Sequence, residues 1–363
     1  MVDDDIAAIR RRPGMYVGDT RDGSGLHHLL WELLGNAIDE HLAGGAARVE
    51  ITIRGRAVTV EDDGRGIPIT PTRSPRGERP ALELLLTVLG ADVRRERGEP
   101  HVHIGDDIRG VGLAAVNALC EELRVETTRA GRRYAITCAR GRVASPLREL
   151  GPAARPGTRV TFTPDPEVFG DGSLELARVH ARARELSYLN PRALMIVNGE
   201  ELRAPGGLRD AVSARARART GDPPPILHAR GDLGGVAVEL ALCWIDASEH
   251  DPEVISYVSQ FPTRDGGTHV RGLWAGLRQA LVRRVPTIRG LSTDRFRAAA
   301  GRGLIASVHA DLYAPRFGSP TKDRLESPEA RAAVRAALVP ALETWLEDHP
   351  RALASLRARL DAA

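Results

Sequence analysis

The sequence lacks any apolar run of the roughly 20 residues that cross a bilayer, and no hydrophobic stretch follows its charged start, MVDDDIAAIRRR. It also lacks a CxxC pair, and its three cysteines, Cys120, Cys138 and Cys243, are widely spaced. The odd number and wide spacing argue against a disulfide framework and suit a reducing compartment, and the absence of CxxC argues against a cysteine zinc site. We therefore expect a cytoplasmic protein without membrane contact, in which Cys120 and Cys138 fill the core.

Neither sign of charge dominates, since 51 basic residues stand against 48 acidic ones, for a net charge of +3 and a pI near 9.0. Arginine far outnumbers lysine. This balance permits a weak DNA-facing surface, although an ordinary solvated surface is the preferred interpretation. With 363 residues and 42% hydrophobic content, the chain fits two globular domains.

Hydrophobic periodicity predicts the elements of the first half. Apolar residues at three- and four-residue steps indicate an amphipathic helix over 24–42. Alternation predicts a hairpin of strands 48–54 and 57–61, followed by a glycine-rich loop over 62–68 and an exposed connection over 70–80. Beyond these we expect a helix over 82–89, a long polar loop over 90–107, a helix from Gly112, strands at 123–128, 133–139 and 158–163, a helix over 174–188 and a strand at 193–198.

A domain boundary is expected near Pro205-Gly-Gly207, so the predicted domains are 1–206 and 207–363. The second domain should contain strands at 235–245, 253–258 and 304–313 and a helix over 270–284. A final helix should begin at Pro328 with Ser327 as its N-cap and run toward the C-terminus.

Three short patterns carry chemistry in the first domain. Glu32, Asn36, Asp39 and Glu40 recur at steps of about four, so they share one edge of the helix, where a carboxylate and an amide can orient a water and a hydrated magnesium ion. Asp62-x-Gly64-x-Gly66 places a carboxylate acceptor on a loop that can approach a flat base. Gly110-Val-Gly112 precedes a helix, where phosphate is favoured. Each pattern alone is weak, but their order and placement together indicate a nucleotide site.

Longer motifs carry a family resemblance. Arg12-Pro-Gly-Met-Tyr-Val-Gly18, Asn36-Ala-Ile-Asp-Glu40, the run 62–68, Asp265-Gly-Gly-Thr-His269 and Thr321-Lys322 closely resemble motifs of the gyrase B and topoisomerase IV B subunits, within the GHKL ATPase superfamily. The resemblance spans nearly the whole chain. It implies an α+β fold: a GHKL (Bergerat) ATP-binding sandwich of helices on a mixed sheet, followed by an α/β transducer domain of ribosomal-S5-like type.

The resemblance also implies a role for each matching residue. Glu32 would be the general base that polarises the attacking water, and Asn36 would bind Mg²⁺ and, through it, the ATP phosphates. Asp62 would accept the adenine amino group, assisted by Thr158. Lys322 would contact the γ-phosphate from the transducer. The remaining implied ATP-site residues are Asp39, Glu40 paired with Arg65, Gly64, Gly66, Ile67, Pro68, Gly110, Val111 and Gly112, and Arg129 falls beside the family's inhibitor site.

The sequence departs from the family around the phosphates. Asp106-Asp-Ile-Arg-Gly-Val-Gly112 stands where the family has Gly-Gly-Leu-His-Gly-Val-Gly, so two carboxylates add like-charge repulsion, which Arg109 would partly offset. Upstream, Arg94 stands where the family has a lysine and would be the substitute cation. Pro320 replaces a glutamine two residues before Lys322. From the ends of the sequence we expect no N-terminal arm and no TOPRIM or DNA-cleavage domain, so the chain alone should not cleave DNA. A piece of a longer protein and a short paralogue both stay open, with the paralogue favoured.

The leading hypothesis is a magnesium-dependent ATPase module that uses ATP as a conformational signal. The expected partners are ATP and ADP, gyrase-type subunits or DNA through a partner, and a second copy in a nucleotide-dependent homodimer. One alternative is a non-catalytic nucleotide- or inhibitor-binding paralogue with a regulatory or decoy role. Another is a scaffold recruited to a different ATP-dependent reaction. Inhibitor binding without turnover would favour the first alternative.

Overall fold

The computed structural model describes residues 2–74, 77–89, 112–246, 250–319 and 322–363. Contacts within the chain divide it into two compact units. The first unit comprises Met1–Ser187 and Arg192–Arg203, and the second comprises Tyr188–Pro191 and Ala204–Ala363. The domain limits expected at 206 and 207 stay a prediction.

A mixed sheet organises the first unit. Its eight strands within the described ranges run in the order β10–β9–β1–β2–β8–β5–β6–β7, and only β1 and β9 pair in parallel. The bounds are β1 (Arg48–Arg54), β2 (Ala57–Asp62), β5 (Cys120–Arg129), β6 (Arg132–Ala139), β7 (Arg142–Pro152), β8 (Gly157–Pro164), β9 (Leu194–Val197) and β10 (Glu200–Leu202). The alternation of buried and exposed positions along β1, β2 and β8 shows that one face of the sheet carries the core.

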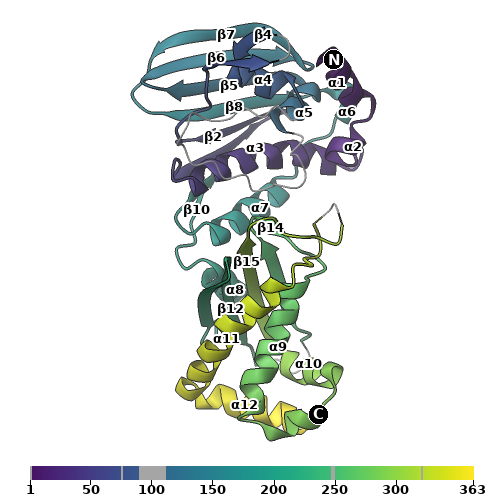
Figure 1. Ribbon diagram of the computed structural model, residues 1–363, viewed down its shortest axis with the longest axis vertical. Helices are drawn as coiled ribbons and strands as arrows, with labels where there is room; N and C mark the ends of the chain where they lie inside the picture. The colour runs from purple at the N-terminus through teal and green to yellow at the C-terminus, as the bar shows by residue number, and fades with distance from the viewer. Residues whose placement is uncertain (1, 75–76, 90–111, 247–249, 320–321) are drawn as a thin grey trace. The chain divides into compact units, whose positions relative to one another are not determined.

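Helices cover this sheet, and α3 (Ser24–Leu42) lies along its central strands (Figure 1). Leucines at helical spacing bury one face of α3 against the sheet, which explains why the 24–42 prediction is confirmed to the residue. The other helices of this unit are α1 (Val2–Arg11), α2 (Gly14–Val17), α4 (Ala81–Thr87), α5 (Gly112–Ala118), α6 (Pro166–Phe169) and α7 (Leu176–Leu189), whose last residues belong to the second unit. Cys120 and Cys138 are buried free thiols in this core, as expected.

Three strand regions of the first unit were missed, one of them the short edge strand β10. Residues expected to form an exposed connection instead form a small hairpin of β3 (Pro71–Ser74) and β4 (Gly77–Pro80). β7 was not expected because it contains two prolines and several charges. It lies at the edge of the sheet, where a proline costs no ladder hydrogen bond on the open side and charged side chains face solvent.

The second unit is also a sheet covered by helices. Within the described ranges its strands run β11–β12–β15–β13–β14, with β13 and β15 parallel. Their bounds are β11 (Leu227–Leu233), β12 (Val236–Trp244), β13 (Glu253–Val258), β14 (Phe261–Pro262) and β15 (Leu304–Leu312). The helices are α8 (Leu208–Thr220), α9 (Thr268–Val282), the 3₁₀ turn η1 (Pro286–Gly290), α10 (Thr293–Gly301), α11 (Glu329–Asp348) and α12 (Pro350–Asp361). Helices α9 and α11 pack side by side (Figure 1).

The final helix differs from its prediction in two respects. Ser327 does not cap α11, since its hydroxyl accepts a hydrogen bond from the Arg316 N–H at 2.9 Å and Pro328 takes the cap position. The helix also ends at Asp348, and Pro350 starts α12, because a proline is accepted at a first helical turn but disfavours helix in the residue before it.

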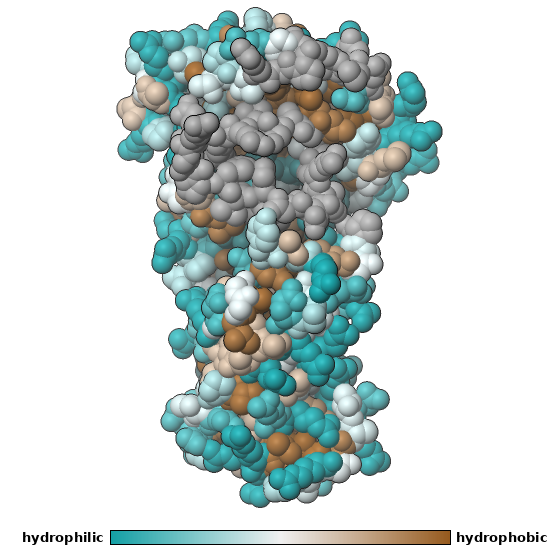
Figure 2. Space-filling model, in the orientation of Figure 1, coloured by the Kyte–Doolittle hydropathy of each residue, from teal (hydrophilic) through white to brown (hydrophobic). Residues whose placement is uncertain are grey.

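Among the described residues, no helix combines the length and apolarity needed to span a membrane. On the face shown in Figure 2, hydrophilic residues predominate outside the grey regions, and apolar residues lie in small groups between them. Large side chains exposed singly, such as Met15 and Tyr313, are normal on folded proteins.

Candidate nucleotide-binding site

The candidate site is built around the helix α3. Its buried leucines fix the rotation of the helix, which leaves Glu32 half-buried and Asn36 exposed, while Asp39 and Glu40 are buried. The four side chains predicted to share one edge therefore differ in exposure. Asn36 has access to solvent, whereas Glu40 is turned into the protein.

Glu40 holds the glycine-rich loop that follows β2. Its carboxylate accepts hydrogen bonds from Arg65 through Nε at 2.6 Å and Nη2 at 3.1 Å, and from the Arg65 backbone N–H at 2.9 Å. This is a bidentate ion pair with an added main-chain bond, which fixes direction as well as charge. The pairing of Glu40 with Arg65, implied by the family resemblance, is confirmed.

Close packing explains the two glycines of the loop. A Cβ on Gly64 would lie 2.2 Å from Cγ of Glu40, and a Cβ on Gly66 would lie 2.4 Å from the Thr128 carbonyl oxygen. Gly66 also has φ +81°, in the left-handed region that favours glycine. The sequence interpretation assigned these glycines to the approach of a base. The contact that the structure shows is with α3 and β5.

Strand β5 supports the same loop from its other side. The Thr127 hydroxyl donates to the Ile67 carbonyl at 3.1 Å, and Arg129 Nη1 donates to the Gly66 carbonyl at 3.1 Å. Pro68 is buried and Ile67 packs against the core. Arg129, predicted to lie beside an inhibitor site, therefore touches the loop directly. Thr127 was missed because a threonine inside a strand carries no signal beyond strand propensity.

Asp62 lies at the end of β2 and begins the loop. Its carboxylate accepts the Gly64 N–H at 3.0 Å, and its register partner across the sheet is Thr158 on β8. The pKa of Asp62 is raised to about 7, chiefly by desolvation on burial and to a smaller extent by the carboxylates of Glu40 and Asp63, while hydrogen bonds from Gly64 and Thr158 act in the opposite direction. A carboxyl group whose pKa is raised to near 7 is typical of a functional position.

Asp63 was also missed. Its carboxylate accepts the backbone N–H groups of Ala47 and Arg48 at 2.7 and 2.8 Å, which ties the start of the loop to β1. The sequence signal was present, because aspartate in a tight turn commonly accepts backbone N–H groups.

Glu32 contacts the predicted phosphate-binding segment, Gly110 to Gly112, at Gly112, which is its one residue that the structure describes. The Gly112 N–H donates to Glu32 Oε2 at 3.3 Å, so the start of α5 lies beside the carboxylate. Asn117 anchors α5 to α4 by donating to the Leu86 carbonyl at 2.8 Å. Glu32 and Gly112 are therefore brought together, as a site containing both requires. Arg94, Arg109, Gly110 and Val111, with the departures at Asp106 and Pro320, lie outside the described residues.

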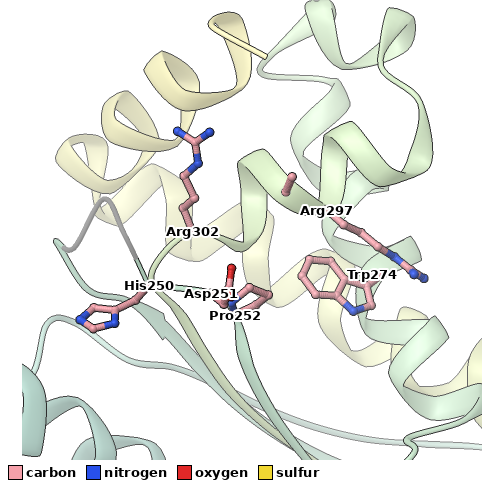
Figure 3. Close-up of a pocket in the computed structure, with 7 residues that line it drawn as sticks. His250, Asp251, Pro252, Trp274, Arg297 and Arg302 are labelled. Atoms are coloured by element: carbon pink, nitrogen blue, oxygen red, sulfur yellow. The ribbon is translucent and has the colours of Figure 1, made fainter.

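Lys322 belongs to the second unit, where it is buried, with 8% of its surface exposed. The same unit contains an open pocket of about 440 Å³ lined by His250, Asp251, Pro252, Trp274, Arg297, Ala298 and Arg302. Figure 3 shows that the side chains of Arg297 and Arg302 point away from one another. None of the predicted site residues lines this pocket.

The side-chain oxygens of the first unit suit magnesium better than zinc. In the described part of the chain, no group of three or more histidine, cysteine, aspartate or glutamate residues could hold a metal ion. Magnesium differs from zinc in this respect, because it keeps several waters and is bound through one or two protein oxygens plus substrate phosphates. The exposed amide of Asn36 suits this mode of binding.

Comparison with known proteins identifies the family. Residues 21–168 match the family described as histidine kinase-, DNA gyrase B- and HSP90-like ATPase, and residues 207–361 match DNA gyrase B. The B subunit of the type 2 topoisomerase of Aquifex aeolicus is 35% identical over 93% of this chain and 43% of that protein. The B subunit of DNA gyrase from Thermus thermophilus is 36% identical over 95% of this chain and 55% of that protein. The chain thus spans about half the length of these relatives.

Solved structures agree. The 43K ATPase domain of Thermus thermophilus gyrase B, in complex with an aminocoumarin, matches with a TM-score of 0.79 and 32% identity, over 98% of this chain and 93% of that one. The gyrase B-subunit of Myxococcus xanthus matches with a TM-score of 0.80 and 26% identity, over 98% and 99% of the two chains. The α+β fold expected from the sequence is confirmed. The chain therefore belongs to the gyrase B family of GHKL ATPase subunits and matches the ATPase region of that family.

Proposed function

We propose that this chain binds ATP with Mg²⁺ in the first unit and hydrolyses it. The observation that supports this most directly is the arrangement of two carboxylates on one scaffold: Asp62 on a loop clamped by Glu40 and β5, and Glu32 beside the Gly112 N–H. In this proposal one carboxylate reads a base and the other acts near phosphate. Relatives with this fold are ATPase subunits.

In this proposal Asp62 accepts the exocyclic amino group of adenine, with Thr158 beside it, and Ile67 and Pro68 line the base. Asn36 supplies an oxygen to Mg²⁺, which would neutralise charge on the phosphates when bound. Glu32 orients the attacking water and accepts its proton as the new P–O bond forms and the bond to the β-phosphate oxygen breaks. Lys322 supplies a cation to the γ-phosphate. Asp39, buried on α3, belongs to the same ATP site in this proposal.

The central test is Glu32→Gln, which keeps the side-chain shape and removes the base. Steady-state ATP turnover should fall by about 10²–10⁴-fold, while calorimetry with Mg²⁺ and a non-hydrolysable ATP analogue should show binding close to wild type. Glu149→Gln is the matched control, since this carboxylate is exposed and pairs with Arg132 on neighbouring strands. Unchanged turnover in Glu32→Gln, or a wild-type protein that binds neither ATP nor ADP, would overturn the proposal.

A second candidate is a non-catalytic protein that binds nucleotide or gyrase-directed inhibitors. Arg129 supports it, because its guanidinium contacts the Gly66 carbonyl at the base-binding loop, and the Thermus thermophilus relative is described in complex with an aminocoumarin. Aminocoumarin binding by a wild-type protein with no measurable turnover would favour this candidate. Unaltered aminocoumarin affinity in Arg129→Ala would count against it.

The wider biology belongs to the same proposal, because the chain spans only about half of its relatives' length. We place it in the cytoplasm, as a module whose nucleotide state is relayed through the second unit to gyrase-type subunits or to a second copy. Sedimentation with and without the ATP analogue tests the homodimer: an unchanged sedimentation coefficient would remove that part of the proposal.

A further inference from the structure

Lys322 lies on two aromatic rings of its own unit. Its Nζ is 4.1 Å from the ring centroid of Phe261 and 5.8 Å from that of Phe317. Both distances are within the roughly 6 Å over which a ring face attracts a cation. The lysine is buried, and both rings are half-buried, so water screens this attraction less than it would on an open surface. We call Phe261 and Phe317 the lysine seat.

The backbone around the seat is fixed by main-chain bonds. Asp265 N–H donates to the Asp323 carbonyl at 2.9 Å, Leu325 N–H donates to Gly266 at 3.0 Å, and Thr268 N–H donates to Leu325 at 3.0 Å. A Cβ on Gly267 would lie 2.2 Å from the Leu325 carbonyl oxygen, so only glycine allows this approach. Two segments distant in sequence are thereby joined, and one carries the lysine while the other follows Phe261.

Lys322 also adopts φ +58°, in the left-handed region that non-glycine residues rarely occupy. Such a conformation persists where surrounding contacts determine it. The main-chain bonds and the two rings are among the contacts that hold it. The ammonium position is therefore set by the fold.

Composition makes this position unusual. Of the 51 basic residues, Lys322 is the only lysine, and the other 50 are arginine. Phenylalanine is also scarce, yet two of the five in the sequence meet at this lysine. A chain built almost entirely with arginine thus carries a compact ammonium here. An ammonium over a ring keeps N–H donors that can turn toward an anion, whereas a planar guanidinium stacks flat on the ring and directs its donors along the ring plane.

We propose that Phe261, with Phe317 as the second ring, is a positioning residue that orients the ammonium of Lys322 for the γ-phosphate. This rests on the proposed function of Lys322. The ring faces attract the cation and hold its ammonium at a defined place, which is what positioning for phosphate requires. The seat also requires lysine, so arginine at 322 should not replace it.

The seat itself can be observed without any turnover. Because Lys322 is the only lysine, reductive ¹³C-methylation of the full chain labels one side chain and the N-terminal amine, and a Lys322→Arg sample identifies the N-terminal signal. The dimethyl-lysine signal should be displaced upfield by the ring currents in wild type. Phe261→Leu should remove most of this displacement. An unshifted signal in wild type, or the same shift in Phe261→Leu, would show that the Lys322 side chain does not lie over the Phe261 ring.

The positioning role is tested by steady-state kinetics of ATP hydrolysis. Phe261→Leu should lower kcat by about 2–10-fold with little change in KM, and Phe261→Trp should restore it. In a Lys322→Met background, Phe261→Leu should have no further effect. An equal loss in both backgrounds, or no rescue by tryptophan, would mean that Phe261 acts only through folding and would overturn the role.

These outcomes separate the two proposals. A wild-type chain without turnover would overturn the proposed function, and the positioning role with it, whatever the methyl signal shows. Normal wild-type turnover that falls in Glu32→Gln but is unaltered in Phe261→Leu would overturn the positioning role alone. Lys322→Arg should lose as much kcat as Lys322→Met, and full activity in Lys322→Arg would contradict the requirement for lysine.

Discussion

The two units hold their titratable side chains in different ways. In the first, Glu40 is 6% exposed and is held by the guanidinium of Arg65. In the second, Lys322 lies on the rings of Phe261 and Phe317. An ion pair neutralises its members and fixes their directions, whereas a ring fixes a cation without neutralising it. The first arrangement suits the support of a loop, and the second suits the orientation of a cationic side chain.

Breaking the ion pair should have the largest effect on stability. Arg65→Met leaves the Glu40 carboxylate buried without its guanidinium, and such a loss costs about 3–5 kcal/mol for fully buried pairs. Arg65 is 24% exposed, so water can solvate part of the site, and we expect a smaller loss of about 2–3 kcal/mol in the free energy of unfolding of the first unit. Urea unfolding followed by hydrogen exchange of peptides from each unit measures this.

The double variant is the control for that prediction. Glu40→Gln with Arg65→Met removes both charges, so it should lose clearly less than the sum of the two single variants. If the loss of unfolding free energy in the double variant equals the sum of the losses in the two single variants, the pair does not hold the loop.

Glycine at position 66 should be the next most sensitive feature of the same loop. Gly66→Ala adds a Cβ 2.4 Å from the Thr128 carbonyl at φ +81°, so we expect a loss of about 2 kcal/mol from clash and strain together. Gly23→Ala is a matched control, because Gly23 has φ +78° and ψ −9°, in the left-handed region, but no heavy atom within 4 Å of the added Cβ. It should cost about 1 kcal/mol from backbone strain alone. Equal losses in thermal unfolding would mean that β5 does not constrain the loop.

The two units should respond to acid in opposite directions. Burial raises the pKa of Asp62 to about 7 from 3.8, so its contribution to stability is present at low pH and is lost as pH rises through about 7. Burial, with a smaller effect of His309, lowers the pKa of His269 to about 3 from 6.5, so its contribution is present above 6.5 and is lost as pH falls toward 3.

Variants separate these two effects. The free energy of unfolding of Asp62→Asn, relative to wild type, should be about 1–2 kcal/mol more favourable to folding at pH 8 than at pH 5. That of His269→Gln, relative to wild type, should be more favourable to folding at pH 5 than at pH 8. Thermal unfolding at both pH values measures the differences. The nucleotide adds a second test, since an adenine amino group favours the carboxylate form of Asp62. Affinity for ADP should therefore fall as pH drops below about 7, and an affinity independent of pH would contradict this role.

The sequence predicted the parts of the fold in which one signal dominates. The leucine spacing of α3 and the alternation of β1 have no competing pattern, and both elements were predicted with their observed bounds. The strand β7 was missed because its prolines contradict strand propensity, and only its place at the sheet edge makes them acceptable. Helix α8 was missed because its many arginines obscure a buried stripe of small apolar residues.

The residues of the site also divide into those that local sequence patterns predicted and those that they did not. Motif spacing placed Glu32, Glu40 and Asp62 on the right elements because those elements are local in sequence. The support from Thr127 and Arg129 depends on the pairing of β5 with β8, which spacing within a motif cannot express. Likewise, the seat of Lys322 joins positions 261, 317 and 322 through loop contacts, so the sequence identified the lysine and not its rings.

The smallest effect is expected for an ion pair of the same chemistry at the surface. Arg159 pairs with Glu61 through Nη2 at 2.7 Å, one residue from Asp62 and Thr158, but the two side chains are 51% and 34% exposed. Water and salt screen such pairs, so Arg159→Met should cost less than about 1 kcal/mol in urea unfolding, and less still at high salt. A loss equal to that of Arg65→Met would show that proximity to the site, and not burial, determines how much a pair stabilises this unit.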